Sequence, residues 1–315
     1  MSSNMLTSSS TKHFSRVIDA INSGFDNTSP SMPEGSQFGF KAVIMADGVE
    51  IHSDAFDIEF DIPFDDDLIA NEAEIVVYNL SYETANKLKL DNPITVTAGY
   101  GDDTGIIFEG FISNVITYRD GVDLITTISC LDDIQFTPQM MTEKTYAAGT
   151  KASTILKDLL EIEGIPVEVF SVARDYTYTD ETKVDGSIVE NIKSYSEICG
   201  VSTYIYKQRR YCRPIGEGDE LNFKINSDTG MIGSPEPFEE EVQREDYIDT
   251  VTGLNINMIL QHRVAVSGIV NVDSINHKGV YRIQSGEHSY DGLSATTNLK
   301  CIGTVTTKVE AKDTK

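Results

Sequence analysis

The chain has 315 residues, of which 40% are hydrophobic, enough for about two ordinary domains. Its 50 acidic and 25 basic residues give a net charge of −25, which excludes nonspecific binding to nucleic acid or to anionic lipid, because such binding needs a basic surface. No apolar run has the length of a membrane span or the position of a signal peptide, so we expect no membrane insertion and synthesis in a reducing cytosol. The four cysteines form no C-x-x-C pair and are expected to be small buried hydrophobic residues: Cys130, Cys199, Cys212 and Cys301.

Residues 1–37 are predicted to form an N-terminal arm and linker. Residues 1–12 are rich in Ser and Thr and are expected to be disordered. Phe14, Val17, Ile18 and Ile21 then fall on one face at helical spacing, which predicts a short amphipathic helix. Such an arm is either inert or docks on a neighbouring subunit.

Residues 38–140 have the pattern of a small antiparallel β-barrel module. In the clearest strand, 56–62, apolar and acidic residues alternate, which predicts one buried and one solvent-facing side. Asp47-Gly48 predicts a tight hairpin, and Ser81 is a candidate N-cap of a short helix. Gly-containing turns separate the strands, as in a barrel or sandwich. The expected strands are 40–44, 56–62, 74–78, 94–100, 106–115 and 123–131.

Residues 141–228 are predicted to be an α+β insertion with two helices. The first helix covers 150–163 and ends at Gly164, and the second begins at Ser187 and ends at Gly200. Strands are expected at 201–206 and 211–214, with 207–210 as their turn. A second β-barrel module is assigned to 229–305, with an alternative start at 221, and opens with the extended connector TGMIGSPEP at 229–237. Residues 306–315 are expected to be a frayed tail.

The two β-modules resemble each other. An offset of 176 pairs Asn79 with Asn255, Leu80 with Ile256, Leu88 with Val264, Ile94 with Val270 and Val96 with Val272. An offset of 171 pairs Ile112 with Ile283, Asp120 with Asp291, Gly121 with Gly292, Thr126 with Thr297, Ile128 with Leu299 and Cys130 with Cys301. The offset changes around GYGDDTG, a predicted hairpin tip where insertions are tolerated. The fold class is therefore mainly β with an α+β insertion and a pseudo-duplicated pair of barrels.

Motifs for catalysis or metal binding are absent from the sequence. The acidic run Asp57, Glu59, Asp61, Asp65, Asp66 and Asp67 lacks the order of a calcium loop and is interpreted as a solvated strand face. None of the five histidines lies in H-E-x-x-H, and neither G-x-S-x-G nor a phosphate loop occurs. We therefore assign no catalytic, cofactor or metal residue. The densest basic cluster, a candidate docking patch for an acidic neighbour, is Lys207, Arg209, Arg210 and Arg213.

The order of these parts resembles the central hub proteins of contractile-tail baseplates in phages, prophage remnants and R-type bacteriocins. The resemblance covers about residues 38–305. The matching stretches are VVYNLSYETANKLKLDNPITVTAGY, IIFEGFISNV, TGMIGSPEP, HRVAVSGIVNVDS and KGVYRIQSGEHSYDG. This chain departs from the family at Leu260-Gln261-His262, where an Asn-Pro-like turn is expected.

The resemblance implies a structural protein without enzymatic activity or cofactor. Three chains with two barrels each would give a pseudo-sixfold homotrimer that joins a sixfold tail tube to a threefold spike. The implied partners are further copies of the chain, the tube protein, the central spike protein and baseplate wedge or tape-measure components. Assembly would occur in the bacterial cytoplasm and the product would sit in the baseplate. The alternatives are a carbohydrate- or partner-binding β module and a cell-wall hydrolase.

Overall fold

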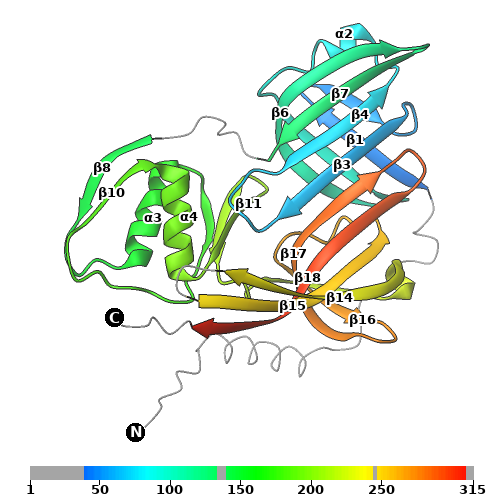
Figure 1. Ribbon diagram of the computed structural model, residues 1–315. Coiled ribbons are helices and arrows are strands. Elements are labelled where there is room, and N and C mark those ends of the chain that lie inside the picture. The colour runs from blue at the N-terminus through cyan, green and yellow to red at the C-terminus, as the bar shows by residue number, and fades with distance from the viewer. Residues whose placement is uncertain (1–38, 133–139, 244–246, 310–315) are drawn as a thin grey trace.

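The computed structural model describes residues 39–132, 140–243 and 247–309. Three parts are distinguished below: the first β unit (39–132), the insertion (140–218) and the second β unit (219–309). The two β units lie against each other, and the insertion stands beside them (Figure 1). The chain is mainly β, as the sequence predicted.

The first β unit is an antiparallel sheet whose strands follow the order β3-β4-β7-β6-β5-β1-β2. Alternation buries Ile58, Phe60 and Ile62 on one side of β3, as predicted. Asp47 and Gly48 both have positive φ, the conformation of a type I′ turn, and Ser81 caps the short helix α2. The elements are β1 (Phe40–Ala46), β2 (Val49–His52), β3 (Ile58–Asp65), β4 (Glu72–Tyr78), α2 (Tyr82–Ala85), β5 (Pro93–Tyr100), β6 (Asp103–Asp120) and β7 (Asp123–Leu131).

The insertion packs two helices against two small sheets, β10-β8 and β11-β12-β9. Helix α3 ends at Gly164 in the left-handed conformation, and Ser187 caps α4, as predicted. In α3, Leu160 is buried and Ile162 is 40% exposed, so the face of the helix that packs on the insertion core includes Leu160 and leaves out Ile162. The elements are β8 (Met140–Tyr146), α3 (Ala152–Glu163), β9 (Val167–Phe170), β10 (Thr182–Ser187), α4 (Ile188–Cys199), β11 (Ser202–Tyr206) and β12 (Arg209–Arg213).

The second β unit has the order β14-β15-β18-β17-β16-β13. Because β13 pairs with β16, this unit begins at Asp219, before both predicted starts. The stretch 229–237, predicted as an extended connector, lies mostly in β14, which pairs with β15. The elements are β13 (Asp219–Ile225), η1 (Ser227–Thr229), β14 (Met231–Gln243), β15 (Tyr247–Ile259), β16 (Gly268–Asp273), β17 (Lys278–Tyr290) and β18 (Ala295–Val309).

Two predictions concern the ends of the chain. Strand β18 pairs with β15 as far as Val309, so the expected frayed tail was wrong for 306–309. The predicted arm at 1–37 and the end of the tail, 310–315, lie outside the described residues.

The two β units have matching strand orders, β3-β4-β7-β6-β5 and β14-β15-β18-β17-β16. Ile112 pairs with Cys130 and Ile283 with Cys301, and a one-residue bulge follows in both β6 and β17. The units differ at one edge, because β1 lies antiparallel to β5 whereas β13 lies parallel to β16. The proposed pairing of Asn79 with Asn255 was wrong, because Asn79 follows β4 whereas Asn255 lies inside β15, opposite Lys300.

Strand β3 pairs with β17, which joins both β units into one 13-stranded sheet. This pairing joins residues more than two hundred positions apart and was not predicted. It fixes the junction between the units, where the candidate functional residues lie.

Candidate functional site

The junction between the two β units has an aromatic centre. Strands β3 and β17 pair from Asp65 opposite Ser285 to Phe60 opposite Tyr290. Phe40 packs on the ring of Tyr290, with 4.3 Å between centroids. The Tyr100 hydroxyl crosses the junction and donates to the Ala295 carbonyl at 3.2 Å. The two units are thus joined by main-chain pairing and by shared core packing.

A buried ion pair lies beside this seam. Arg282 on β17 donates from Nη1 to Oδ2 of Asp66, just after β3, at 2.6 Å, and both side chains are under 10% exposed. Its other nitrogens donate to Ser267 Oγ at 2.6 Å and to the Glu217 carbonyl at 2.8 Å. Both charged groups are removed from water, so each is stabilised by the other. Removing one of them would leave the other charge buried and unpaired, which would destabilise the folded protein. The pair therefore locks the end of β3 onto the second β unit.

A second, more exposed contact links the start of β6 to the turn after β15. Arg263 donates to both carboxylate oxygens of Asp103, at 2.6 and 2.7 Å. His262 Nε2 lies 2.9 Å from the same carboxylate. The hydrogen bond from Arg263 and that from His262 lower the pKa of Asp103 against the opposing effect of burial. His262 belongs to the stretch Leu260-Gln261-His262, and its contact with Asp103 joins the two β units.

His288 lies buried on β17 at the same junction. Its Nδ1 is 2.8 Å from the hydroxyl of Thr297, and its ring packs on Phe64 at 5.0 Å. Burial, with a smaller contribution from His262, lowers the pKa of His288 to about 3. The imidazole is therefore neutral at physiological pH and acts as a packed core residue.

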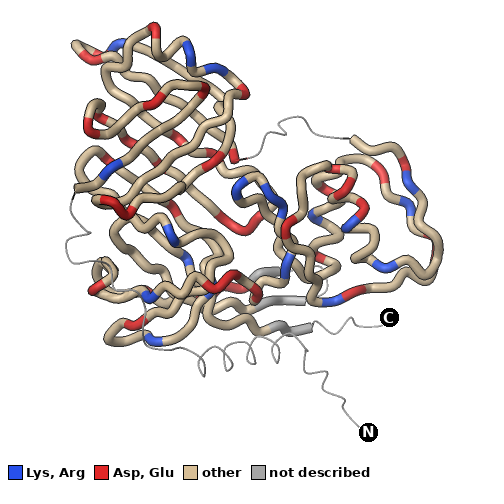
Figure 2. Tube along the Cα trace, turned by 180° about the vertical axis from the view of Figure 1, so that it is seen from behind, with Lys and Arg blue, Asp and Glu red and all other residues tan. Residues whose placement is uncertain are grey.

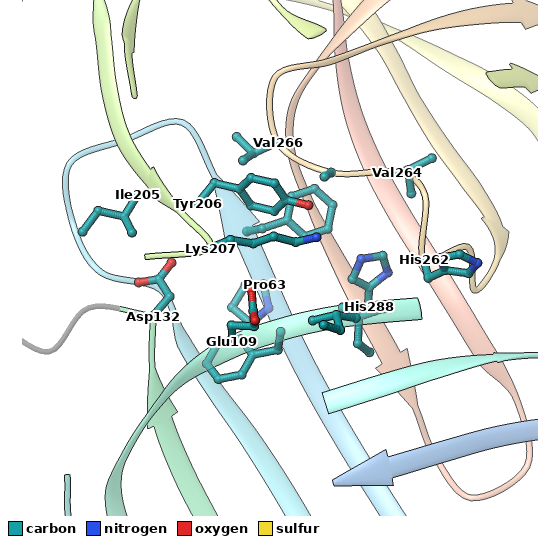
Figure 3. Close-up of a pocket in the computed structure, with 15 residues that line it drawn as sticks. Pro63, Glu109, Asp132, Ile205, Tyr206, Lys207, His262, Val264, Val266 and His288 are labelled. Carbon is teal, nitrogen blue, oxygen red and sulfur yellow. The ribbon is translucent and has the colours of Figure 1, made fainter. Parts of the chain in front are cut away.

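The β11–β12 hairpin holds the insertion against the first β unit. Its turn is Lys207-Gln208, both with positive φ, whereas 207–210 was predicted. Gln208 Nε2 donates to the main-chain carbonyl of Asp132 at 2.7 Å and of Glu109 at 3.4 Å. Figure 3 shows Lys207, Glu109 and Asp132 around this hairpin tip. The hairpin tip thus docks within its own chain.

The four residues of the predicted docking patch differ in burial. Lys207 and Arg209 are exposed, whereas Arg210 and Arg213 are buried. Arg210 pairs with the buried Glu163 at the end of α3, at 2.5 Å. Arg213 lies over the ring of Tyr211 and pairs with Asp219 at 2.9 Å.

Two of the four residues therefore hold the insertion together and attach it to the second β unit. The prediction that these four residues form one exposed patch was therefore wrong. A docking role for Lys207 and Arg209 stays a proposal.

A narrow crevice opens where the three parts meet. Pro63, His262, His288 and Lys207 lie around it, with contributions from all three parts (Figure 3). Its cavity volume is about 40 Å³, room for a few water molecules. His262 and His288 at its wall already take part in the contacts described above, so the crevice is interpreted as part of the junction between the three parts.

Residues of the acidic run and the four cysteines take part in packing and ion pairing within the fold. Asp66 is in the buried ion pair, and burial raises the pKa of its neighbour Asp65 to about 6. Within the described ranges, no group of three or more His, Cys, Asp and Glu residues could hold a metal ion.

All four cysteines are free and buried, as predicted, and burial raises the pKa of Cys130 and Cys301 to about 12. No helix in the described part of the chain is long and apolar enough to cross a membrane.

Solved tail proteins share this fold. A tail protein from Neisseria meningitidis has a TM-score of 0.58 at 9% identity, covering 84% of this chain and 97% of its own. The 43 kDa tail protein of prophage MuSo2 from Shewanella oneidensis has a TM-score of 0.59 at 10% identity, covering 84% of this chain and 98% of its own. An Escherichia coli component of the type VI secretion system, described as similar to bacteriophage tail proteins, has a TM-score of 0.52 at 8% identity, covering 83% and 76%.

No protein-family model matches the sequence, and no curated protein matches it. The predicted resemblance to tail proteins is confirmed at the level of the fold. The chain therefore has the fold of these tail proteins and of a component of the type VI secretion system.

Proposed function

We propose that this chain is the structural hub of a contractile-tail baseplate. The observation that supports this most is the fold shared with two tail proteins over nearly their whole length, 97% and 98%. On this proposal the chain is a component of a phage, prophage or bacteriocin particle, assembled in the cytoplasm. It acts by position and carries out no reaction.

The matching strand orders of the two β units support a duplicated module. Three chains would then supply six similar units, enough for a ring that matches a sixfold tube on one side and a threefold spike on the other. The β3–β17 pairing and the buried Asp66–Arg282 pair would hold the two units of each chain at a fixed angle. A rigid angle is what such a ring needs, because every unit must meet its neighbours at the same spacing.

The proposed partners are further copies of the chain, the tail tube protein, the central spike protein and wedge or tape-measure components. Lys207 and Arg209 are the exposed basic residues offered for an acidic neighbour. Because the whole chain has a net charge of −25, an acidic partner would be attracted to this basic surface and repelled elsewhere, which would favour one orientation of that partner.

The test is the mass of the purified protein by light scattering, alone and after co-expression with a candidate spike protein and a candidate tube protein. A trimer of about 105 kDa, three times the 34.8 kDa chain, with a six-lobed ring in electron micrographs would support the hub. A chain that stays monomeric and binds neither partner would overturn it. Clearing of purified cell walls by the protein alone would instead favour a hydrolase.

A further inference from the structure

Strand β6 has an unpaired edge along its second half. Residues 103–111 of β6 pair with β5 on this edge, and β7 pairs with the opposite edge as far as Asp120. In the described part of the chain, no strand pairs with residues 114–119 on the side of β5. These residues are called here the β6 edge. Their main-chain N–H and C=O groups on that side are open to pairing with another strand.

Strand β17, the counterpart of β6 in the second β unit, has no such open edge. The two strands correspond because Ile112 pairs with Cys130 in the first unit and Ile283 with Cys301 in the second. The first part of β17 pairs with β16, and residues 285–290 pair with β3 on the same edge. The contact that joins the two β units is therefore made by the part of β17 that corresponds to the β6 edge.

Strand β14 is the counterpart of β3 and has an unpaired edge as well. Asp61 of β3 pairs with Glu74 of β4. Glu236 of β14 pairs with Asn255 of β15 in the same way. Glu74 and Asn255 are equivalent, because each directly follows the residue that pairs with the matching cysteine of β7 or β18. Among the described strands, β14 pairs with β15 alone, and residues 236–240 are called here the β14 edge.

The contact within the chain fixes the register of an equivalent contact between copies. Ser289 lies opposite Asp61 where β17 pairs with β3. Tyr118 occupies the place of Ser289, because the offset of 171 relates β6 to β17, and Glu236 occupies the place of Asp61. The same register therefore places Tyr118 of one copy opposite Glu236 of the next. One molecule cannot make this contact alone, since β6 and β14 lie at opposite ends of its two β units (Figure 1).

This register brings two apolar side chains together. Two residues along from Tyr118 and Glu236, Ile116 of one copy lies opposite Phe238 of the next. Ile116 is 52% exposed in the single chain. Phe238 is half-buried, with the ammonium group of Lys300 at 4.9 Å from its ring centre. Each of the two apolar side chains would gain an apolar neighbour across the new pair of strands.

The two edges also differ in charge. The β6 edge contains one basic residue, Arg119, and no acidic one, although Asp120 follows it. The β14 edge contains three glutamates, Glu236, Glu239 and Glu240, so two β14 edges would bring like charges together. Acidic residues are spread over both β units (Figure 2), and an edge without them is a favourable place for β14.

Pro237 determines which pairs of the equivalent ladder are hydrogen-bonded. Proline has no N–H to donate, so its nitrogen is expected to face the open edge of β14 rather than β15. Phe238 then directs its main-chain groups to β15, and Ile116 with Phe238 forms a non-hydrogen-bonded pair, in which opposite side chains come closest. The ladder lacks one bond at Pro237, which also makes the β14 edge a poor template for unrelated strands.

We propose that the β6 edge of one copy pairs with the β14 edge of a second copy, so that the sheet continues from chain to chain. The pairing repeats between copies the β3–β17 contact within each chain. It deepens the proposed hub function and rests on it for closure, since a head-to-tail contact gives either a ring or an open filament. In the hub, three such contacts would alternate with the three β3–β17 contacts.

Disulfide cross-linking tests the pairing and its register. Ile116→Cys and Phe238→Cys are introduced into separate full-length chains, which are mixed at the highest soluble concentration and mildly oxidised. We expect a disulfide-linked dimer in the mixture, because the two positions are opposite and close. The four native cysteines are buried and should not react. Circular dichroism checks that each variant is folded.

Two controls make this result specific. Asp120→Cys, four residues along β6 on the same face and about 13 Å away, replaces Ile116→Cys and should give about tenfold less disulfide with Phe238→Cys. Equal cross-linking by Asp120→Cys would overturn the proposed register. Neither variant should cross-link when oxidised alone. Dimers of Ile116→Cys alone would show that two β6 edges pair with each other, which would overturn the proposal.

A chain that carries both Ile116→Cys and Phe238→Cys separates this proposal from the hub function. In a trimeric ring, oxidation should link up to three chains and no more, as a non-reducing gel can show. A ladder of longer products would support the pairing and contradict the closed ring of the hub. A ring with the candidate tube and spike proteins in which no cross-link forms would leave the hub standing and overturn the pairing. Absence of the cross-link both in the isolated protein and in that complex would also overturn it.

Discussion

Removing the carboxylate of Asp66 should destabilise the protein strongly. Arg282 is 1% exposed on its side chain and has Asp66 as its charged partner, with Ser267 and a carbonyl as neutral acceptors. Asp66→Ala leaves a desolvated guanidinium without its counter-charge, which costs about 3–5 kcal/mol. Asp66→Asn keeps an oxygen acceptor in place and should cost less, about 1.5–3 kcal/mol.

The assay is equilibrium urea unfolding followed by circular dichroism and by tyrosine fluorescence, since the chain has no Trp. The double variant Asp66→Ala, Arg282→Met removes both charges and should be less destabilised than the sum of its single changes, with a coupling of about 2 kcal/mol or more. Glu83→Ala is the control, because Glu83 and Lys87 form an exposed pair at 3.8 Å. Such a pair contributes about 0.5 kcal/mol or less. A cost below about 1 kcal/mol for Asp66→Ala, or additive single changes, would refute the reasoning.

Three further predictions concern the junction and the core. His288 has a depressed pKa in the folded state, so its stabilising effect is present above pH 6.5 and decreases as pH falls toward about 3. About 2 kcal/mol should be lost by pH 5, and His288→Asn should flatten that slope in urea titrations at each pH. Gly105→Ala would place a methyl 2.1 Å from the His262 ring, so it should cost about 1–3 kcal/mol, and His262→Ala in the same chain should relieve the cost. Cys130 and Cys301 should resist iodoacetamide at pH 8 until urea unfolds the chain, as mass spectrometry can show.

Local structure was predictable because it depends on neighbouring residues. Asp47-Gly48 supplies the positive φ that a type I′ turn requires, and Ser187 can cap only the helix that follows it. Alternation along 56–62 identified the buried face of β3 from a single strand. These features need no knowledge of the rest of the chain.

Partners distant in sequence were not predictable from one sequence. Arg210 was placed on an exposed patch, yet its counter-ion Glu163 lies on a helix 47 positions earlier. A signal was present, because Arg209 and Arg210 are adjacent in a strand and must face opposite sides. Using that signal required placing the turn at Lys207-Gln208 rather than across 207–210. The β3–β17 pairing had no such signal, since any exposed strand edge could have served.

The structure separates two kinds of contact that a ring of six units would need. Within a chain, the two β units meet through paired strands, a shared aromatic core and the buried Asp66–Arg282 pair. A contact between chains would have to form after folding, from surfaces that remain soluble in the monomer. The net charge of −25 helps to meet that requirement, because like-charged chains repel one another until a complementary partner surface binds. Since the contact within a chain includes a shared aromatic core and buried charges, it would differ from the contact between chains, and the two contacts would alternate around the ring. Duplicated units would then keep threefold rather than sixfold symmetry where a spike binds.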